Sequence, residues 1–284
     1  MKELVLTYED FSSNRKSLNG AEPLPGTTWT MGGIFAQYSG LPLKTSFEMN
    51  SQDLENGFFN NIITLGDIFK NHGVHMLEDY NSAIEQGYID ASYYRWWGYE
   101  DLKLFEIAKE KIEYLYSLKQ PFCLTILTAD THAEDGHFCQ QCSSRYDNQY
   151  ANVIACSSRQ VSKFVKWVRQ EPFYKNTTIV LAGDHLTMDS DFCLNIDKEY
   201  SRKTFVSYIN SCNQVEDVKK ARIYSEMDLF PTTIASLGFK IEGNRLGLET
   251  NLFSKEETLL EKYGYDYLNK ELKKSSFMLK LENN

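Results

Sequence analysis

The feature that most constrains the fold is the short phrase Gly183-Asp184-His185, which follows the apolar run of residues 177–182. A β-branched run that ends abruptly in polar residues is typical of a buried strand. In open α/β sheets, ligands bind at the carboxyl ends of the strands. A carboxylate and an imidazole at such an end suit a divalent metal such as zinc or manganese. The alternative interpretation is that Asp184 caps the next turn and His185 lies on the surface.

A second apolar run has the same ending. Residues 122–128 are followed by Asp130 and His132, and amphipathic patterns at about 99–118 and 153–168 predict helices beside the strands. Strands that alternate with helices indicate an α/β fold with a mainly parallel sheet, flanked by helices on both faces. Parallel strands would bring the two Asp/His pairs to one edge of that sheet, which strengthens the metal-site interpretation.

A helix is predicted after residues 26–30, because the small and apolar residues 31–38 follow and Gly40 can end it. A hydroxyl at a helix start lies beside unpaired backbone N–H groups and the positive end of the helix dipole. Such a position favours a phosphoryl group and lowers the cost of an alkoxide, which makes Thr27 or Thr28 a candidate nucleophile. The alternative is that one of these threonines only caps the helix.

Further elements complete the pattern. A helix is expected from about residue 60 to 73, a strand near a sheet edge at 204–209, and a helix capped by Asp228 that ends at Gly238. The charged residues from 255 onward predict a loosely attached helical tail. We therefore expect one large domain over residues 1–254 and a tail over residues 255–284.

Composition excludes several function classes. The chain has 284 residues, of which 42% are hydrophobic and 24% charged, as expected of one large globular domain with a small appendage. Its net charge of -9 argues against non-specific binding to nucleic acid. No apolar run reaches the roughly 18 residues that a membrane span needs. The first residues lead directly into a mixed segment, so no signal peptide is expected.

Three of the six cysteines cluster in the sequence, at Cys139, Cys142 and Cys156. This spacing is compatible with a structural disulfide, with a zinc site that His137 would complete, or with unpaired thiols. Cys123 lies inside an apolar run and is expected to be a small core residue.

Several motifs, in this order, resemble those of the sulfatase-fold phosphoglycerol transferases. That family includes the enzymes that modify osmoregulated glucans (membrane oligosaccharides) and, more distantly, the lipoteichoic acid synthases. The resemblance covers about residues 20–255 and implies an alkaline phosphatase/sulfatase-like α/β fold. The matching stretches are Gly26-Thr27-Thr28-Trp29-Thr30, Asp130-Thr131-His132, Ser157-Ser158-Arg159-Gln160-Val161, Gly183-Asp184-His185, Met227-Asp228-Leu229-Phe230-Pro231-Thr232-Thr233, Arg245-Leu246-Gly247-Leu248 and Asn251-Leu252-Phe253.

The resemblance implies phosphoryl transfer by a covalent route. In the family, a metal-bound threonine at a helix start attacks phosphatidylglycerol, diacylglycerol leaves, and the glycerophospho-threonine passes its group to an acceptor hydroxyl. The metal lowers the pKa of the hydroxyl and offsets charge on the phosphoryl oxygens. For this chain the resemblance implies that Thr27 is the nucleophile, with Thr28 as the second choice. Thr27, Asp184 and His185 hold the ion, expected to be Mn²⁺, with Mg²⁺ or Zn²⁺ as alternatives.

The resemblance also implies substrate contacts. His132 matches the histidine that contacts the phosphate, where it can hydrogen-bond an oxygen or protonate the leaving group. Arg95 is a candidate phosphate contact, and Trp97 belongs to an aromatic stretch that can stack on sugar rings or lipid head groups. The implied partners are the phosphatidylglycerol head group, at the membrane surface, and a glycan or glycolipid acceptor. The implied location is the outer face of the cytoplasmic membrane, the periplasm or the cell surface, as part of a membrane-anchored parent.

Two departures from the family pattern leave other functions open. The family's first strand, which ends in a metal-binding glutamate, has no counterpart, and Glu9 is an imperfect substitute. A family segment with a substrate-contacting arginine is missing between residues 73 and 79. The alternatives are therefore another sulfatase-fold hydrolase or phosphodiesterase, or a catalytically impaired relative that binds glycans. Sulfate esters are disfavoured, because residues 26–29 lack the C/S-x-P-x-R context that formylglycine needs.

Overall fold

The computed structural model describes residues 20–43, 62–70, 74–76, 80–194, 196–197, 199–215 and 222–274. The chain divides into two compact units. Unit 1 comprises the described residues of Phe69–Thr177 and Thr187–Tyr200, and unit 2 those of Asn14–Ile68, Thr178–Leu186 and Ser201–Asn284. The predicted boundary between the large domain and the tail, at residues 254/255, lies inside unit 2. The division into two units does not test it, and it stays a prediction.

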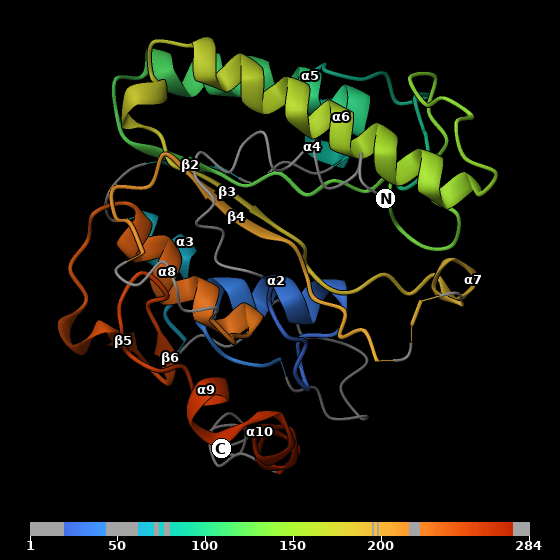
Figure 1. Ribbon diagram of the computed structural model, residues 1–284. Helices are drawn as coiled ribbons and strands as arrows, with labels where there is room; N and C mark the ends of the chain where they lie inside the picture. The colour runs from blue at the N-terminus through green and yellow to red at the C-terminus, as the bar shows by residue number, and fades with distance from the viewer. Residues whose placement is uncertain are drawn as a thin grey trace, which may run out of the picture. The chain divides into compact units, whose positions relative to one another are not determined.

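Unit 1 is mostly helical. Two long helices, α5 and α6, lie side by side in it (Figure 1), with the ring centroids of Phe105 and Phe164 4.9 Å apart. Strands β1 and β2 pair in parallel, with Val74 opposite Phe122. The elements are β1 (Val74–Met76), α4 (Tyr80–Glu85), α5 (Asp101–Ser117), β2 (Phe122–Leu124), α6 (Gln149–Gln170), η1 (Tyr174–Asn176) and α7 (Ser190–Cys193).

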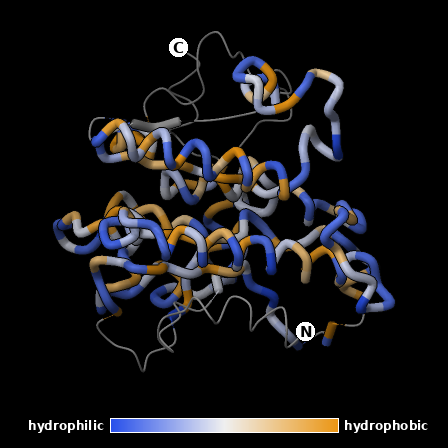
Figure 2. The backbone as a smooth tube through the Cα atoms, turned by 90° about the horizontal axis from the view of Figure 1, so that it is seen from above, coloured by the Kyte–Doolittle hydropathy of each residue, from blue (hydrophilic) through white to orange (hydrophobic). Residues whose placement is uncertain are grey.

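Helix α6 illustrates how the sequence forms these elements. The side chain of Asn148 caps it by accepting a hydrogen bond from the N–H of Ala151 at 2.8 Å. Val153, Val165 and Val168 are buried along one face, as the apolar spacing predicts. The same alternation of hydrophobic and hydrophilic residues recurs along the helical parts of the chain (Figure 2).

Unit 2 contains the elements that carry Gly183-Asp184-His185. Strand β3 pairs with β4 in antiparallel fashion, with Ile179 opposite Ile209, and β5 and β6 form a short hairpin. Helix α3 (Leu65–Lys70) crosses the boundary between the units. The remaining elements are α2 (Thr30–Ser39), β3 (Ile179–Ala182), β4 (Val206–Ile209), η2 (Glu226–Asp228), α8 (Leu229–Ser236), η3 (Glu242–Asn244), β5 (Arg245–Leu246), β6 (Glu249–Thr250), α9 (Leu259–Tyr263) and α10 (Tyr265–Leu272).

The prediction of a mainly parallel sheet is wrong for the part of the chain that the structure describes. Three two-stranded pairs are present there, and two of them are antiparallel. The connection between β3 and β4, residues 183–205, has the length of a crossover, but the two strands pair in opposite directions, with Ala182 opposite Val206. The predicted strand 122–128 stops at Leu124, where its partner β1 ends at Met76. Strands β2 and β3 therefore lie in separate pairs.

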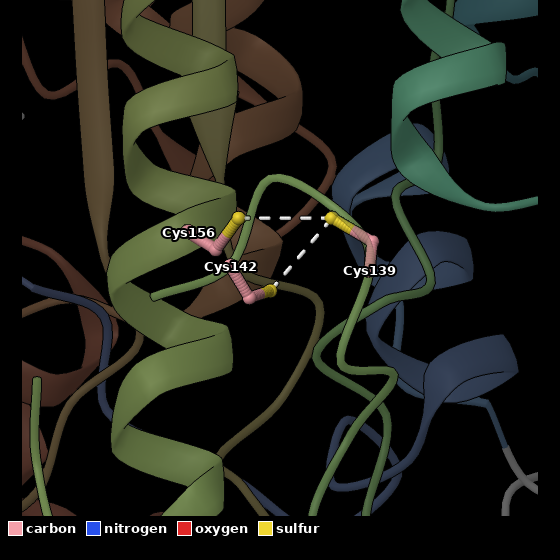
Figure 3. Close-up of side chains that lie close together, drawn as sticks. All are labelled: Cys139, Cys142 and Cys156. Carbon is pink, nitrogen blue, oxygen red and sulfur yellow. Dashed lines mark hydrogen bonds between the residues drawn. The ribbon is translucent and has the colours of Figure 1, made fainter. Parts of the chain in front are cut away.

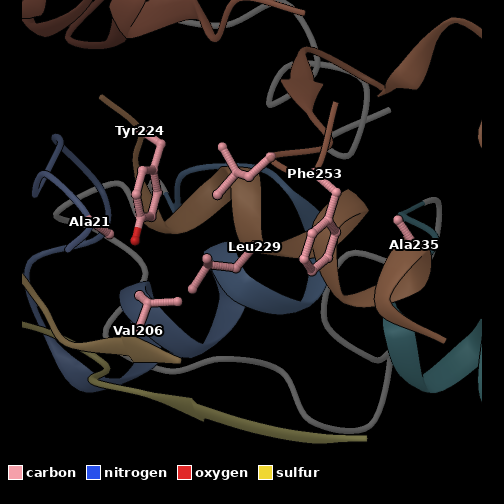
Figure 4. Packing of buried hydrophobic residues seen from close by; sticks show 7 residues of the cluster. Ala21, Val206, Tyr224, Leu229, Ala235 and Phe253 are labelled. Carbon is pink, nitrogen blue, oxygen red and sulfur yellow. The ribbon is translucent and has the colours of Figure 1, made fainter. Parts of the chain in front are cut away.

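The core of unit 2 joins segments far apart in the sequence. Residues from the N-terminal segment, β4, the segment before η2, α8 and the segment after β6 pack together (Figure 4): Ala21, Val206, Tyr224, Leu229, Ala235, Leu252 and Phe253. A second cluster packs Leu260 and Leu268 of the tail against Leu24 and Ala36. The described part of the tail, residues 255–274, is thus firmly packed rather than loosely attached. No helix in the described residues has the length and apolarity required to cross a bilayer.

Candidate active site

The candidate site in unit 2 is built around the first residue of α2. The Oγ1 atom of Thr30 lies 3.2 Å from Nε2 of His185. The other ring nitrogen of His185, Nδ1, lies 2.8 Å from the carbonyl oxygen of Leu186. Because a carbonyl only accepts hydrogen bonds, Nδ1 carries the proton and the lone pair of Nε2 faces the threonine hydroxyl. The hydroxyl of Thr30 therefore donates to Nε2.

Asp184 adds a carboxylate to this pair. Its Oδ2 atom lies 3.5 Å from Nε2 of His185, and its Oδ1 atom accepts a hydrogen bond from the backbone N–H of His185 at 3.0 Å. The side chains of His185 and Asp184 are 14% and 30% exposed. A hydroxyl, a carboxylate and an imidazole thus meet at the N-terminus of α2, where the helix dipole and free N–H groups favour an anion.

Close packing of α2 against the end of β3 brings these groups together. A Cβ atom on Gly33 would lie 1.8 Å from the carbonyl oxygen of Asp184, so only glycine fits there. The side chain of Gln37 donates a hydrogen bond to the carbonyl oxygen of Gly183 at 2.7 Å. Gly40 ends the helix in the left-handed region, with φ 68°. The predicted helix and its terminating glycine are confirmed.

The hydroxyl of Thr27 is engaged elsewhere. This residue is fully buried, and its Oγ1 atom lies 3.0 Å from Oε2 of Glu226 and 3.1 Å from the carbonyl oxygen of Leu24. The same oxygen accepts the N–H of Leu24 at 3.1 Å. Thr28 is exposed. Of the three threonines before and at the start of α2, Thr30 is the one whose hydroxyl contacts His185.

Glu226 is a buried carboxyl that sequence reasoning missed. It accepts hydrogen bonds from Thr27 and, at 3.1 Å, from Oγ1 of Thr204. Burial raises its pKa to about 7, because the charged form loses its hydration. Nothing in the local sequence marks Glu226, since its partners lie 22 and 199 positions away.

The predicted substrate contacts lie in unit 1. The rings of Trp97 and His132 are 4.9 Å apart between centroids, and both side chains are exposed. The guanidinium of Arg95 lies over the ring of Tyr93 at 5.1 Å and donates a hydrogen bond to the carbonyl oxygen of Tyr94. The structure therefore pairs Trp97 with His132, while the Arg95 side chain packs on its own aromatic neighbours.

Asp130, the acidic partner of His132 in the sequence, holds a turn. Its Oδ1 atom accepts the N–H of Asp101 at 3.0 Å, and Oδ1 of Asp101 accepts the N–H groups of Ala129 and Asp130. Burial and the neighbouring Asp130 raise the pKa of Asp101 to about 7. This reciprocal arrangement fixes the start of α5 against the segment that carries His132.

The donor set at Thr30 fits a divalent cation. The carbonyl of Leu186 holds the imidazole of His185 in the tautomer with an unprotonated Nε2, as is usual for a metal-binding histidine. Carboxylate, imidazole and hydroxyl donors suit Mn²⁺, Mg²⁺ or Zn²⁺. Glu9, the suggested substitute for the family's glutamate ligand, lies outside the described residues.

Comparison with known families identifies the chain's relationship. The model of the family described as Sulfatase matches residues 26–239. The chain belongs to the sulfatase family. The match includes α2, the Asp184–His185 pair and α8, so the elements that form the candidate site lie within the family region.

The chain is also similar to curated phosphoglycerol transferases. Phosphoglycerol transferase I of Salmonella choleraesuis (strain SC-B67) is 30% identical over 260 residues, covering 81% of this chain and 33% of that protein. Phosphoglycerol transferase I of Citrobacter koseri is 32% identical over 211 residues, covering 64% of this chain and 28% of that protein. The chain thus spans about a third of the length of these relatives.

Solved structures agree at the level of the fold. The lipoteichoic acid synthase LtaP from Listeria monocytogenes aligns with a TM-score of 0.61 and 14% identity, covering 88% of this chain and 69% of that chain. A protein in the alkaline phosphatase superfamily from Vibrio parahaemolyticus aligns with a TM-score of 0.54 and 16% identity, covering 85% and 64%. The predicted alkaline phosphatase/sulfatase-like fold is confirmed at this level, although the described strands are few and short.

Proposed function

We propose that the chain is a metal-dependent phosphotransferase that moves phosphoglycerol from phosphatidylglycerol to a glycan or glycolipid acceptor. The observation that carries this proposal is the contact of Thr30 Oγ1 with His185 Nε2 at 3.2 Å, beside Asp184. Membership of the sulfatase family and about 30% identity to phosphoglycerol transferase I support it. In this proposal Thr30 takes the role that the sequence pattern suggested for Thr27 or Thr28.

Thr30 acts as the nucleophile in two displacements. Its Oγ1 atom attacks the phosphorus, the bond to the diacylglycerol oxygen breaks, and the proton lost by threonine ends on the departing diacylglycerol. The acceptor hydroxyl then attacks the same phosphorus, its proton returns to Thr30, and the acceptor leaves as the phosphoglycerol diester. The α2 N–H groups stabilise the phosphoryl oxygens in both steps.

Thr30, Asp184 and His185 would hold the cation, which we expect to be Mn²⁺. When bound, it lowers the pKa of the threonine hydroxyl and offsets negative charge on the phosphoryl oxygens. His185 contributes orientation, because the Leu186 carbonyl fixes its ring. Asp184 contributes the negative charge that attracts the ion.

His132 and Trp97 are the proposed substrate contacts, on the strength of the sequence resemblance and their mutual contact. A histidine can protonate the leaving oxygen or hydrogen-bond a phosphoryl oxygen. The exposed ring of Trp97 can stack on a sugar of the acceptor. Arg95 stays a weaker proposal for the phosphate. Because the donor is a membrane lipid, we propose that the reaction takes place at the outer face of the cytoplasmic membrane.

Release of diacylglycerol from phosphatidylglycerol vesicles tests the proposal. With Mn²⁺ present, the wild-type chain is expected to release diacylglycerol and to label an added oligosaccharide with phosphoglycerol. Asp184→Asn is expected to abolish both signals, while Asp191→Asn, an exposed aspartate in α7, keeps them.

The outcomes separate the alternatives. Diacylglycerol release without labelling of the oligosaccharide would identify water as the acceptor and indicate a phosphodiesterase. Binding of the oligosaccharide without any release would contradict the transferase and indicate a glycan-binding relative.

A further inference from the structure

Three cysteine thiols meet in unit 1, away from the elements of the candidate active site in sequence. The Sγ atom of Cys139 lies 3.7 Å from that of Cys142 and 3.7 Å from that of Cys156 (Figure 3). All three sulfurs lie within 4.8 Å of one another, and all three are free thiols. Cys156 belongs to α6, whereas Cys139 and Cys142 lie in the loop before it. The loop therefore contacts α6 through sulfur atoms.

The predicted fourth member of a zinc set is not part of this group. The ring of His137 stacks on Trp96, with 5.8 Å between centroids, and the group of ligand atoms within 4.8 Å consists of the three sulfurs. The Cys₃His alternative is therefore not supported among the described residues, where the ring of His137 lies against Trp96 and outside the group of sulfurs.

A buried amide is directed at the sulfurs. Gln160, one turn after Cys156 on α6, is 5% exposed, and its Nε2 atom lies 3.7 Å from Sγ of both Cys139 and Cys156. Its Oε1 atom is buried and has no hydrogen-bond partner among the described residues. An amide N–H that points at two sulfurs stabilises their thiolate forms, which are the forms that bind a metal.

The sulfur spacing matches a metal tetrahedron. With metal–sulfur bonds of about 2.3 Å, neighbouring sulfurs of a tetrahedral zinc site are about 3.8 Å apart. Both measured separations from Cys139 are 3.7 Å. A disulfide, by contrast, brings two sulfurs to about 2.05 Å. Two of the three sulfur separations are thus those of ligands to a shared ion, and the third is below 4.8 Å.

We propose that Cys139, Cys142 and Cys156 form a Zn²⁺ site with three thiolate ligands. Binding replaces three S–H protons by three zinc–thiolate bonds and releases the protons to solvent. Gln160 donates to two of the thiolates, and a water molecule takes the fourth position on the side of the half-buried Cys142.

The site would fix the loop that carries His132 and His137 onto α6. The N–H of His137 already bonds to the carbonyl oxygen of Asp130 at 2.7 Å, so the loop and the turn at Asp130 move together. A metal bound two residues after His137 would remove the remaining freedom of this segment. The site is independent of the proposed catalytic ion, since it uses sulfur donors in another unit.

Cobalt binding to the reduced, chelator-treated full chain tests the proposal. We expect one equivalent of Co²⁺ to give thiolate-to-metal charge-transfer absorption and the visible bands of tetrahedral cobalt, and one equivalent of Zn²⁺ to abolish them. Cys142→Ser, which changes the half-buried ligand, is expected to lose the charge-transfer band or to weaken binding at least tenfold. Cys212→Ser, an exposed cysteine outside the group, is expected to behave as wild type. Asp184→Asn is expected to keep the signal, which separates this site from the catalytic ion.

Two results would overturn the proposal. The first is a folded, fully reduced chain that shows no thiolate band with cobalt and takes up no zinc. The second is a chain isolated without reductant whose intact mass shows a disulfide among Cys139, Cys142 and Cys156. If Cys139→Ser and Cys156→Ser fail to fold, Cys142→Ser alone decides between the outcomes.

Discussion

Thr27 and Thr30 show how two similar side chains acquire different chemistry from their surroundings. Both hydroxyls lie close to the start of α2, but Thr27 is fully buried against Glu226, whereas Thr30 is partly exposed and faces the Nε2 atom of His185. The sequence prediction chose Thr27 as the nucleophile, with Thr28 second, and missed Thr30. Choosing between the two threonines requires the exact first residue of the helix, and local sequence patterns define that residue only to within a few positions.

Glu226 leads to a prediction about pH. Its pKa is raised from 4.5 to about 7, so the folded chain binds this proton more tightly than the unfolded chain. Its contribution to stability is therefore full below pH 4.5 and is lost as the pH rises through 7. Glu226→Gln removes this dependence. Relative to wild type, the variant's free energy of unfolding is expected to gain about 3 kcal/mol between pH 5 and pH 8.

Urea unfolding at several pH values measures this difference. Asp101→Asn provides a comparison in unit 1, because its carboxyl also has a pKa of about 7 through burial. Parallel stability curves for wild type and Glu226→Gln across this range would contradict the assignment of Glu226 as a protonated buried acid.

At the scale of elements, the contact between α2 and the end of β3 decides the site. Gly33→Ala is expected to lower the free energy of unfolding by about 1–3 kcal/mol or more, because the new methyl group meets the backbone of Asp184 rather than a flexible side chain. It is also expected to reduce diacylglycerol release per folded molecule, since His185 shifts relative to Thr30. Met31→Ala, 52% exposed on the same helix, is the matched control. Equal stability of Gly33→Ala and wild type would contradict the close packing.

Arg222 explains why the described part of the C-terminal tail, residues 255–274, is firmly attached. Its buried guanidinium bonds to both carboxylate oxygens of Glu261, at 2.9 and 3.1 Å, and to the carbonyl oxygens of Leu252 and Ser254. Partial burial would raise the pKa of Glu261, but the bonds from Arg222 outweigh it and the pKa is lowered. The charge pattern of the tail could not reveal this partner, which precedes it by 39 positions.

Arg222→Lys tests this attachment. Lysine keeps the positive charge but cannot form the forked set of bonds, so we expect a loss of about 1.5–3 kcal/mol in the free energy of unfolding, measured with urea. Arg169→Lys, an exposed arginine in the last turn of α6, is expected to change stability by less than about 0.5 kcal/mol. A similarly small effect of Arg222→Lys would show that the tail is held by its apolar contacts alone.

At the scale of the whole molecule, the sequence predicted the long helices and the family better than the sheet. The amphipathic patterns of α5 and α6 identified helices that the structure contains, and α8 lies where the sequence predicted a helix. The prediction that Asp228 caps α8 is wrong, because its carboxylate accepts hydrogen bonds from the N–H groups of Ser225 and Thr250 instead. Strand pairing was not predictable in the same way, because hydrogen-bond partners such as Ile179 and Ile209 lie far apart in the sequence. The contact between Thr30 and His185 was not predictable for the same reason, because the two residues are 155 positions apart in the sequence.

Net charge gives a prediction for the chain as a whole. A charge of -9 repels vesicles of anionic phosphatidylglycerol, and salt screens that repulsion over about 8 Å at physiological ionic strength. Raising NaCl from a few millimolar to 0.15 M is expected to increase the rate of diacylglycerol release about two- to threefold at fixed Mn²⁺. Vesicles diluted with neutral lipid are expected to show a smaller effect. A rate that falls steeply with salt would indicate attraction through a local basic surface instead.

The most direct test of the central claim is to locate the covalent intermediate. The chain is incubated with phosphatidylglycerol and Mn²⁺ without acceptor, quenched in acid, digested and mapped by mass spectrometry. We expect a glycerophospho group on Thr30, absent in Thr30→Ala and retained in Thr28→Ala, with diacylglycerol release reduced at least about a thousandfold in Thr30→Ala. The same group on Thr27 or Thr28, or full release by Thr30→Ala, would contradict the account.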